Sequence, residues 1–93
     1  MKHYIIVKFK EGVDWRSMTG EFGELFSSVR KIEGVLSVIE RVSNSANPTR
    51  FDYMVEMDCT EKGLDNFLSS DEHREWKSRY GDLFERKAIF DCE

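Results

Sequence analysis

The sequence has few of the residues that break or cross-link a chain: one proline and two cysteines among 93 residues. It also lacks long apolar runs, and none approaches the ~20 residues of a membrane span. The apolar run after Lys2 covers only residues 4–7, whereas a signal peptide needs about 7–15. We therefore expect a cytoplasmic protein without a membrane partner. Its length fits one domain over residues 1–93.

Cysteine and histidine are too sparse for a metal centre. Cys59 and Cys92 show neither metal-type spacing nor a Cys-x-x-Cys motif, so free thiols in a reducing compartment are expected. His3 and His73 lack a clear third protein ligand. The sequence therefore predicts no metal and no cofactor.

An excess of positive charge is also absent. The chain has 14 Lys and Arg against 18 Asp and Glu, for a net charge of −4. A nucleic-acid-binding protein needs a basic patch, so this class is disfavoured. The local cluster of Arg74, Lys77 and Arg79 has acidic residues interleaved with it, which is typical of a solvated helix face.

What the sequence does have is a first strand, residues 2–10, that is apolar on both faces. His3, Ile5, Val7 and Phe9 alternate with Tyr4 and Ile6, and lysines end the second row. Such a strand is central and covered on both sides. Helices can cover one side, but the face of Tyr4 and Ile6 needs a second chain.

The remaining segments alternate between helical and strand patterns. Apolar spacings of three and four predict a helix over residues 15–32, capped by Asp14. Strands are predicted over 35–42, 51–58 and 87–92, with Val35 and Ile39 on one face of the second strand. Two further helices are expected. One covers residues 61–68 and follows Thr60, which caps it. The other follows Ser69, which forms a capping box with Glu72. Gly34 suits a left-handed cap after the first helix.

The order β-α-β-β-α-α-β predicts an α+β, ferredoxin-like fold with a four-stranded antiparallel sheet. The first and third strands are then central, and the second and fourth lie at the edges. Cys59 and Cys92 end strands that are separated by strand one, roughly 9.6 Å apart. This is too far for a disulfide within the chain.

Four motifs in order resemble the stress-responsive A/B-barrel (Dabb) family. The opening Lys-His-x-apolar-apolar-apolar-Lys-Phe-Lys corresponds to residues 2–10, and Ile-Pro-Gly-Val to residues 32–35, with Glu33 in place of proline. The segment x-His-Pro-x-His corresponds to residues 69–73, of which only His73 is kept. The closing apolar-apolar-Asp-Tyr corresponds to residues 89–92, with Cys92 in place of tyrosine.

This resemblance implies a homodimer in which two sheets pack face to face as a dimeric α/β barrel, in agreement with the exposed row of Tyr4 and Ile6. The family includes olivetolic acid cyclase, a plant polyketide cyclase, and similar folds occur in small cofactor-free monooxygenases. The resemblance places His3 and His73 at the two histidine positions of the cyclase. Its tyrosine position is Phe67, which has no proton to give.

Two interpretations of function follow. One is a dimeric barrel protein with no assigned reaction and a pocket for an apolar or aromatic small molecule. The other is a cofactor-independent, cyclase-like or monooxygenase-like enzyme that uses His73 and His3 as acid and base, with Tyr53 assisting. The expected pocket residues are apolar and lie between sheet and helices: Ile5, Val7, Phe22, Leu25, Val55, Phe67, Trp76 and Ile89.

The same residues also have structural interpretations that the sequence leaves open. Any core requires apolar residues at these positions. His73 can be a half-buried, hydrogen-bonded helix residue, and His3 a strand-end residue at the solvent rim. Lys87 can neutralise an anionic substrate or simply be exposed at the start of a strand.

Overall fold

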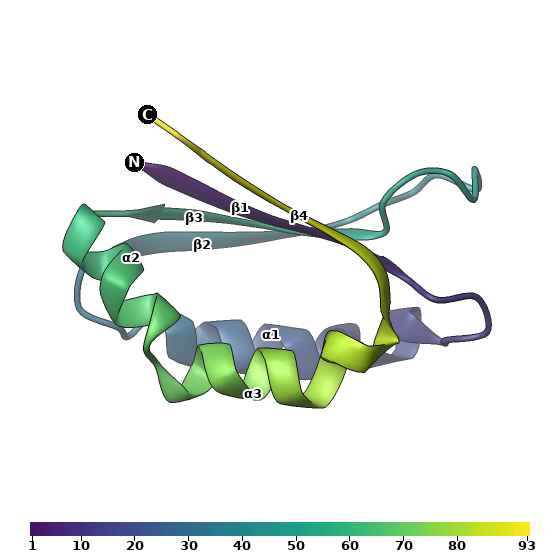
Figure 1. The fold of residues 1–93 in the computed structure, drawn as a ribbon, viewed down its shortest axis with the longest axis horizontal. Coiled ribbons are helices and arrows are strands. Elements are labelled where there is room, and N and C mark those ends of the chain that lie inside the picture. The colour runs from purple at the N-terminus through teal and green to yellow at the C-terminus, as the bar shows by residue number, and fades with distance from the viewer.

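The helices and strands occur in the predicted order in a computed structural model that describes residues 1–93. All helices lie on one side of a single sheet (Figure 1). No helix is long and apolar enough to cross a membrane. The elements are β1 (Lys2–Phe9), η1 (Trp15–Met18), α1 (Thr19–Val29), β2 (Val35–Val42), β3 (Tyr53–Cys59), α2 (Glu61–Leu68), α3 (Asp71–Tyr80), η2 (Gly81–Leu83) and β4 (Phe84–Cys92).

The sheet has the strand order β2-β3-β1-β4, and every neighbouring pair is antiparallel. This confirms the prediction that β1 and β3 are central and that β2 and β4 are edges. His3 on β1 pairs with Met57 on one side and Asp91 on the other. Both cysteines are free and lie on strands that flank β1 from opposite sides.

The two faces of β1 differ as its alternation predicts. Its residues His3, Ile5, Val7 and Phe9 are buried under the helices, while the intervening residues are half-buried. Beneath the helices, aromatic rings pack edge to face. The ring of Phe22 lies 5.5 Å from Trp76 and 4.9 Å from Tyr80, measured between ring centroids. This cluster joins α1 and α3 to the sheet.

The predicted alternation of β2 is wrong. Val35 and Val38 are both buried, whereas Ile39 is exposed. The cause is a bulge between Val35 and Ser37, where the pairing with β3 shifts by one residue. An extra residue in one strand reverses the faces of everything after it.

The helix starts also differ from the prediction. The first helical segment begins as the short 3-10 helix η1, α1 ends at Val29, and Asp14 makes no side-chain capping bond. Thr60 caps α2 as predicted, by accepting a hydrogen bond from the Gly63 amide. Ser70, not Ser69, caps α3 by accepting from the His73 amide at 3.1 Å. β4 begins at Phe84, three residues before the predicted start.

Gly34 adopts the predicted left-handed conformation, with φ of +89°, in a turn between α1 and β2. Its backbone packs directly on Gly63 of α2. A Cβ atom on Gly63 would lie 2.1 Å from the Gly34 carbonyl oxygen. The contact of α2 with this turn therefore requires glycine on both sides.

Candidate functional site

One pocket brings the two histidines together. It has a volume of about 240 Å³ and lies between β1 and β4 of the sheet and helices α2 and α3. Its walls combine apolar and ionisable side chains: His3, Ile5, Leu64, Leu68, His73, Trp76, Lys77, Lys87, Ile89 and Asp91.

His3 is held by an acidic partner. Only 4% of its surface is exposed, so it is not a residue of the solvent rim. Its Nδ1 lies 2.5 Å from Asp91 Oδ1, because the antiparallel register sets His3 directly opposite Asp91. A carboxylate can only accept, so Nδ1 carries a hydrogen, and in the neutral ring Nε2 keeps its lone pair. Asp91 thereby fixes the tautomer and orientation of the ring.

His73 is held by the backbone. It sits in the first turn of α3, and its Nδ1 lies 3.1 Å from the Leu68 carbonyl oxygen. The carbonyl can only accept, so Nε2 is again the unprotonated nitrogen. Burial lowers the pKa of His73, and the charges of Lys77 and Lys87 lower it further, while the bond to Leu68 opposes the shift. His73 is therefore neutral near pH 7 and able to accept a proton.

Phe67 lies next to both imidazoles. Its ring is fully buried, with its centroid 6.1 Å from that of His3 and 5.0 Å from that of His73. The position that holds tyrosine in the cyclase is thus next to both histidines, as the resemblance implies. It brings only a ring edge there and no hydroxyl.

The other predicted site residues divide into two groups. Ile5, Trp76 and Ile89 line the pocket with the histidines. Except for Leu25, the others lie in the core and line no part of it: Val7, Phe22, Tyr53, Val55 and Phe67. Tyr53 donates a hydrogen bond from its hydroxyl to Glu40 Oε1 at 2.6 Å. Burial and then this bond raise the pKa of Tyr53, which keeps the phenol protonated. The structure therefore does not bring Tyr53 to the histidines.

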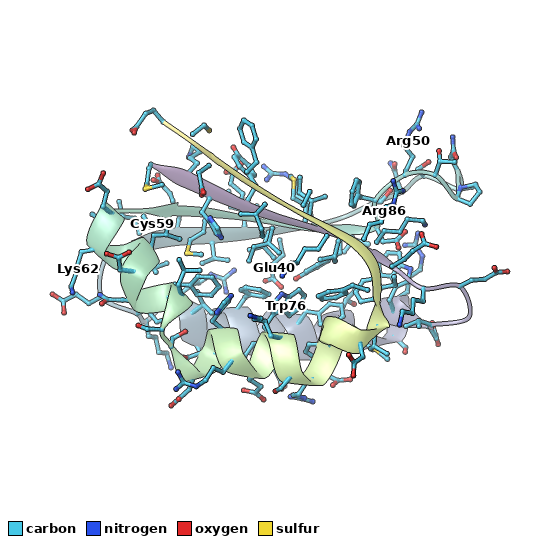
Figure 2. All side chains as sticks on the ribbon, in the orientation of Figure 1. Glu40, Arg50, Cys59, Lys62, Trp76 and Arg86 are labelled. Carbon is cyan, nitrogen blue, oxygen red and sulfur yellow. The ribbon has the colours of Figure 1, made fainter.

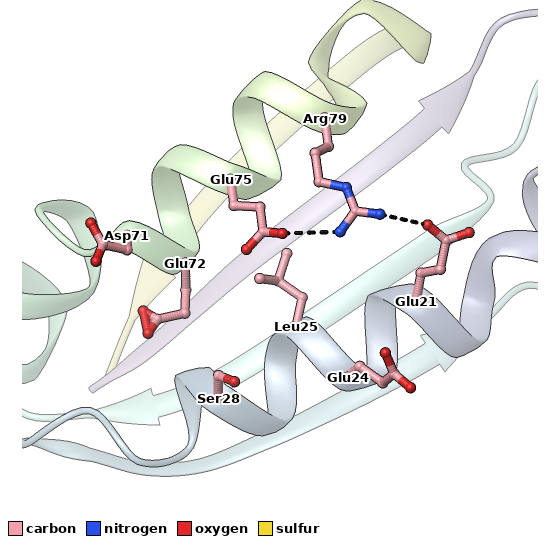
Figure 3. Close-up of a pocket in the computed structure, with 8 residues that line it drawn as sticks. All are labelled: Glu21, Glu24, Leu25, Ser28, Asp71, Glu72, Glu75 and Arg79. Atoms are coloured by element: carbon pink, nitrogen blue, oxygen red, sulfur yellow. Dashed lines mark hydrogen bonds and ion pairs between the residues drawn. The ribbon is translucent and has the colours of Figure 1, made fainter.

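Leu25 lines a different groove, between α1 and α3 on the outer side of the helix layer (Figure 3). This groove of about 300 Å³ is larger but has only one apolar residue. Arg79 bridges Glu75 at 3.0 Å and Glu21 at 2.9 Å across it. Its other lining residues are polar or acidic: Glu24, Ser28, Asp71 and Glu72. It is a solvated helix surface without the apolar walls of a ligand site.

The prediction from sequence gave no polar role in the pocket to Asp91, Lys77 and Trp76. Lys77 could have been found, because it lies four residues after His73 and so on the same face of α3. Asp91 stands in the closing motif, but its partner follows only from the register of β1 with β4. Trp76 was expected only as an apolar wall, yet its indole N–H has no hydrogen-bond partner. No group of three or more His, Cys, Asp or Glu side chains is arranged to hold a metal ion.

Comparison with known proteins gives matches of structure only. No protein-family model and no curated protein sequence matches the chain significantly. A dimeric protein of unknown function and ferredoxin-like fold from Bacteroides fragilis has a TM-score of 0.79 at 16% identity, over 99% of this chain and 93% of that one. A Dabb family protein with a ferredoxin-like fold from Mesorhizobium loti has a TM-score of 0.74 at 12% identity, over 99% and 93% of the two chains.

A third similar structure is the hydroxynitrile lyase from Passiflora edulis, with a TM-score of 0.74 at 10% identity, over 96% of this chain and 87% of that one. Because all three identities are low, these matches establish the fold, which is ferredoxin-like. Function is a separate matter, since one fold carries many activities.

Proposed function

We propose that this chain is a homodimeric stress-responsive A/B-barrel (Dabb) protein, with no assigned reaction, that binds a small apolar or aromatic molecule between its sheet and its helices. The observation that carries the proposal is the pocket in which His3 and His73 share apolar walls with Ile5, Leu64 and Leu68. Apolar walls with a few placed polar groups are the usual form of a small-molecule site.

The dimer is supported by the face of the sheet that no helix covers. Phe90 and Ile39 are 58% and 42% exposed there, and the rings of Tyr4 and Phe90 lie 6.2 Å apart between centroids. Exposed apolar side chains grouped on one face favour association. The Bacteroides fragilis neighbour is described as dimeric. The two free thiols suit a reducing compartment such as the cytoplasm.

A cofactor-independent enzyme is the second candidate. Both imidazoles are held through Nδ1, which leaves two Nε2 atoms with lone pairs in one pocket. In this mechanism His73 accepts a proton from a carbon acid, and His3 is its acid–base partner. One neighbour is named a hydroxynitrile lyase, so the fold does support catalysis in another protein. The absence of a hydroxyl at Phe67 argues against the mechanism of the plant cyclase.

Ligand binding can be tested by saturation-transfer NMR with a set of single-ring aromatic compounds. We expect binding to the wild type and loss of binding in Ile89→Trp, because the larger side chain fills the mouth of the pocket. Ala46→Trp, in the exposed loop between β2 and β3, is the matched control. If Ile89→Trp bound the same compounds as the wild type, the pocket would not be the site.

The enzyme candidate has its own test. Any activity found in a substrate screen must fall strongly in both His73→Gln and His3→Gln, since each removes an Nε2 base. Activity and ligand binding that are unchanged in both variants would exclude acid–base chemistry by this pair.

A further inference from the structure

Three residues that line the pocket, Trp76, Lys77 and Lys87, have hydrogen-bond donors without a partner. Trp76 is only 2% exposed, and its Nε1–H is the one buried side-chain polar atom without a hydrogen-bond partner. Buried donors in proteins are nearly always paired. Aromatic contacts hold its ring in place, with centroids 5.1 Å from Phe26 and 5.4 Å from Phe84. Figure 2 shows Trp76 between the sheet and the helix layer.

The two lysines of the pocket are also without partners. Lys77 on α3 and Lys87 on β4 line it from different elements, and neither forms an ion pair with any carboxylate. Lys10, Lys31 and Lys62 are also unpaired, so what distinguishes Lys77 and Lys87 is that both line one pocket. In a chain of net charge −4, two unpaired ammonium groups around one pocket are a local reversal of sign.

The only carboxylate of the pocket offsets one of these two positive charges, not both. Asp91 is already bonded to His3 Nδ1 at 2.5 Å. His73 contributes no charge near pH 7, for the reasons given above. The pocket therefore keeps an excess of positive charge, and its accessible unpaired donors are the two ammonium groups of Lys77 and Lys87.

We propose that the pocket selects a small monocarboxylate with an apolar body, which Lys77 and Lys87 bind through its charge and the Trp76 ring contacts as part of the apolar wall. A carboxylate has two oxygens and about four acceptor positions, so it can accept from several of these donors together. The volume of about 240 Å³ lies below the roughly 300–1,000 Å³ of drug-sized sites, which limits the body to about one ring. This inference rests on the proposed function, because it names the ligand class of the same pocket.

The test compares benzoate with benzamide, which has the same shape and no charge. Both are titrated into ¹⁵N-labelled protein by NMR at low ionic strength, where screening is weak. We expect benzoate to bind about fivefold more tightly, since exposed lysines contribute modestly to anion binding. The Trp76 indole signal, assigned as the one retained in Trp15→Phe, shifts on binding.

The lysine variants locate the effect. Lys77→Gln and Lys87→Gln each weaken benzoate binding about two- to threefold and leave benzamide binding unchanged. The control variant is Lys62→Gln, at an exposed position of α2 whose side chain points away from the sheet in Figure 2. It changes the affinity for neither benzoate nor benzamide. Equal affinity for the two probes, or lysine variants without effect, overturns the anion preference and leaves the pocket as a ligand site. If neither probe binds and no other single-ring compound does, both this inference and the proposed function fail.

Discussion

The two faces of the sheet are built from the same strands and have opposite surroundings. On β1, Val7 is fully buried under the helices, while its neighbour Ile6 on the other face is only half-buried. On β4, Phe90 on the uncovered face is mostly exposed. Burial inside this chain therefore comes from one side only. The apolar residues of the uncovered face need another surface.

Charged pairs surround these apolar residues and give the uncovered face the composition of an interface. Lys2 lies 3.6 Å from Asp58, and Arg41 lies 3.5 Å from Glu56. Interfaces between proteins commonly combine an apolar centre with a polar rim. Four variants test this contrast between the two faces, in order of decreasing effect.

The largest effect is expected for Val7→Asp. The variant places a carboxylate among fully buried apolar residues with no cation beside it, at a cost of several kcal/mol. This approaches the whole stability of a typical domain of about 5–15 kcal/mol. We expect no cooperative thermal transition in circular dichroism. A folded Val7→Asp protein would show that the helices do not seal this face.

A smaller loss of folding stability, about 3 kcal/mol, is expected for Gly63→Ala. The added Cβ collides with the Gly34 backbone, where α2 meets the edge of the sheet. The matched control is Gly20→Ala in α1, whose Cβ meets nothing within 4 Å. The Gly20→Ala variant should be more stable than the wild type by up to about 1 kcal/mol, because alanine has the higher helix propensity. Chemical denaturation measures both. Equal effects would contradict the close contact between the two glycines.

Tyr53→Phe removes the hydrogen bond to Glu40 under the helices and is expected to cost about 2 kcal/mol, as is usual for a bond to a charged group. Glu40 also lies 3.5 Å from Arg30, which limits the loss. Urea denaturation of Tyr53→Phe and the wild type gives the difference. Since Tyr53 does not line the pocket, ligand binding should be unchanged. A loss of binding would return Tyr53 to the candidate site.

The smallest effect concerns pH. The pKa of His73 is lowered in the folded protein, so the unfolded chain binds the proton more readily. The stabilisation from neutral His73 is complete above its ordinary pKa of about 6.5 and is lost as the pH falls through the lowered folded value. In thermal melts, this part of the pH dependence should disappear in His73→Gln. An identical slope in both proteins would contradict the assigned burial.

Sequence periodicity predicted the fold well where one pattern covers a whole element. The alternation of β1 correctly indicated a central strand with His3, Ile5 and Val7 under the helices, because burial and the period of two coincide there. Periodicity gave the wrong faces for β2. The bulge before Ser37 moves every later residue of that strand to the opposite face of the sheet, and no residue type marks the bulge in the sequence.

The candidate site was predicted only in part, because it depends on register. The two histidines and three apolar walls could be placed from their faces alone. The pair of His3 and Asp91 joins residues 88 apart and depends on how β4 aligns with β1, including a shift between Lys8 and Phe9. The bond of Tyr53 to Glu40 likewise depends on the shifted register of β2. No local pattern encodes either contact.

Native mass spectrometry of the purified wild type and of Ile6→Asp tests most directly whether the uncovered face pairs with a second copy. We predict a wild-type mass of twice 11.0 kDa at micromolar concentration, and a folded monomer of Ile6→Asp, because the carboxylate would be buried in the interface. A wild type that remains at 11.0 kDa, or an Ile6→Asp protein that stays a dimer, would contradict the account.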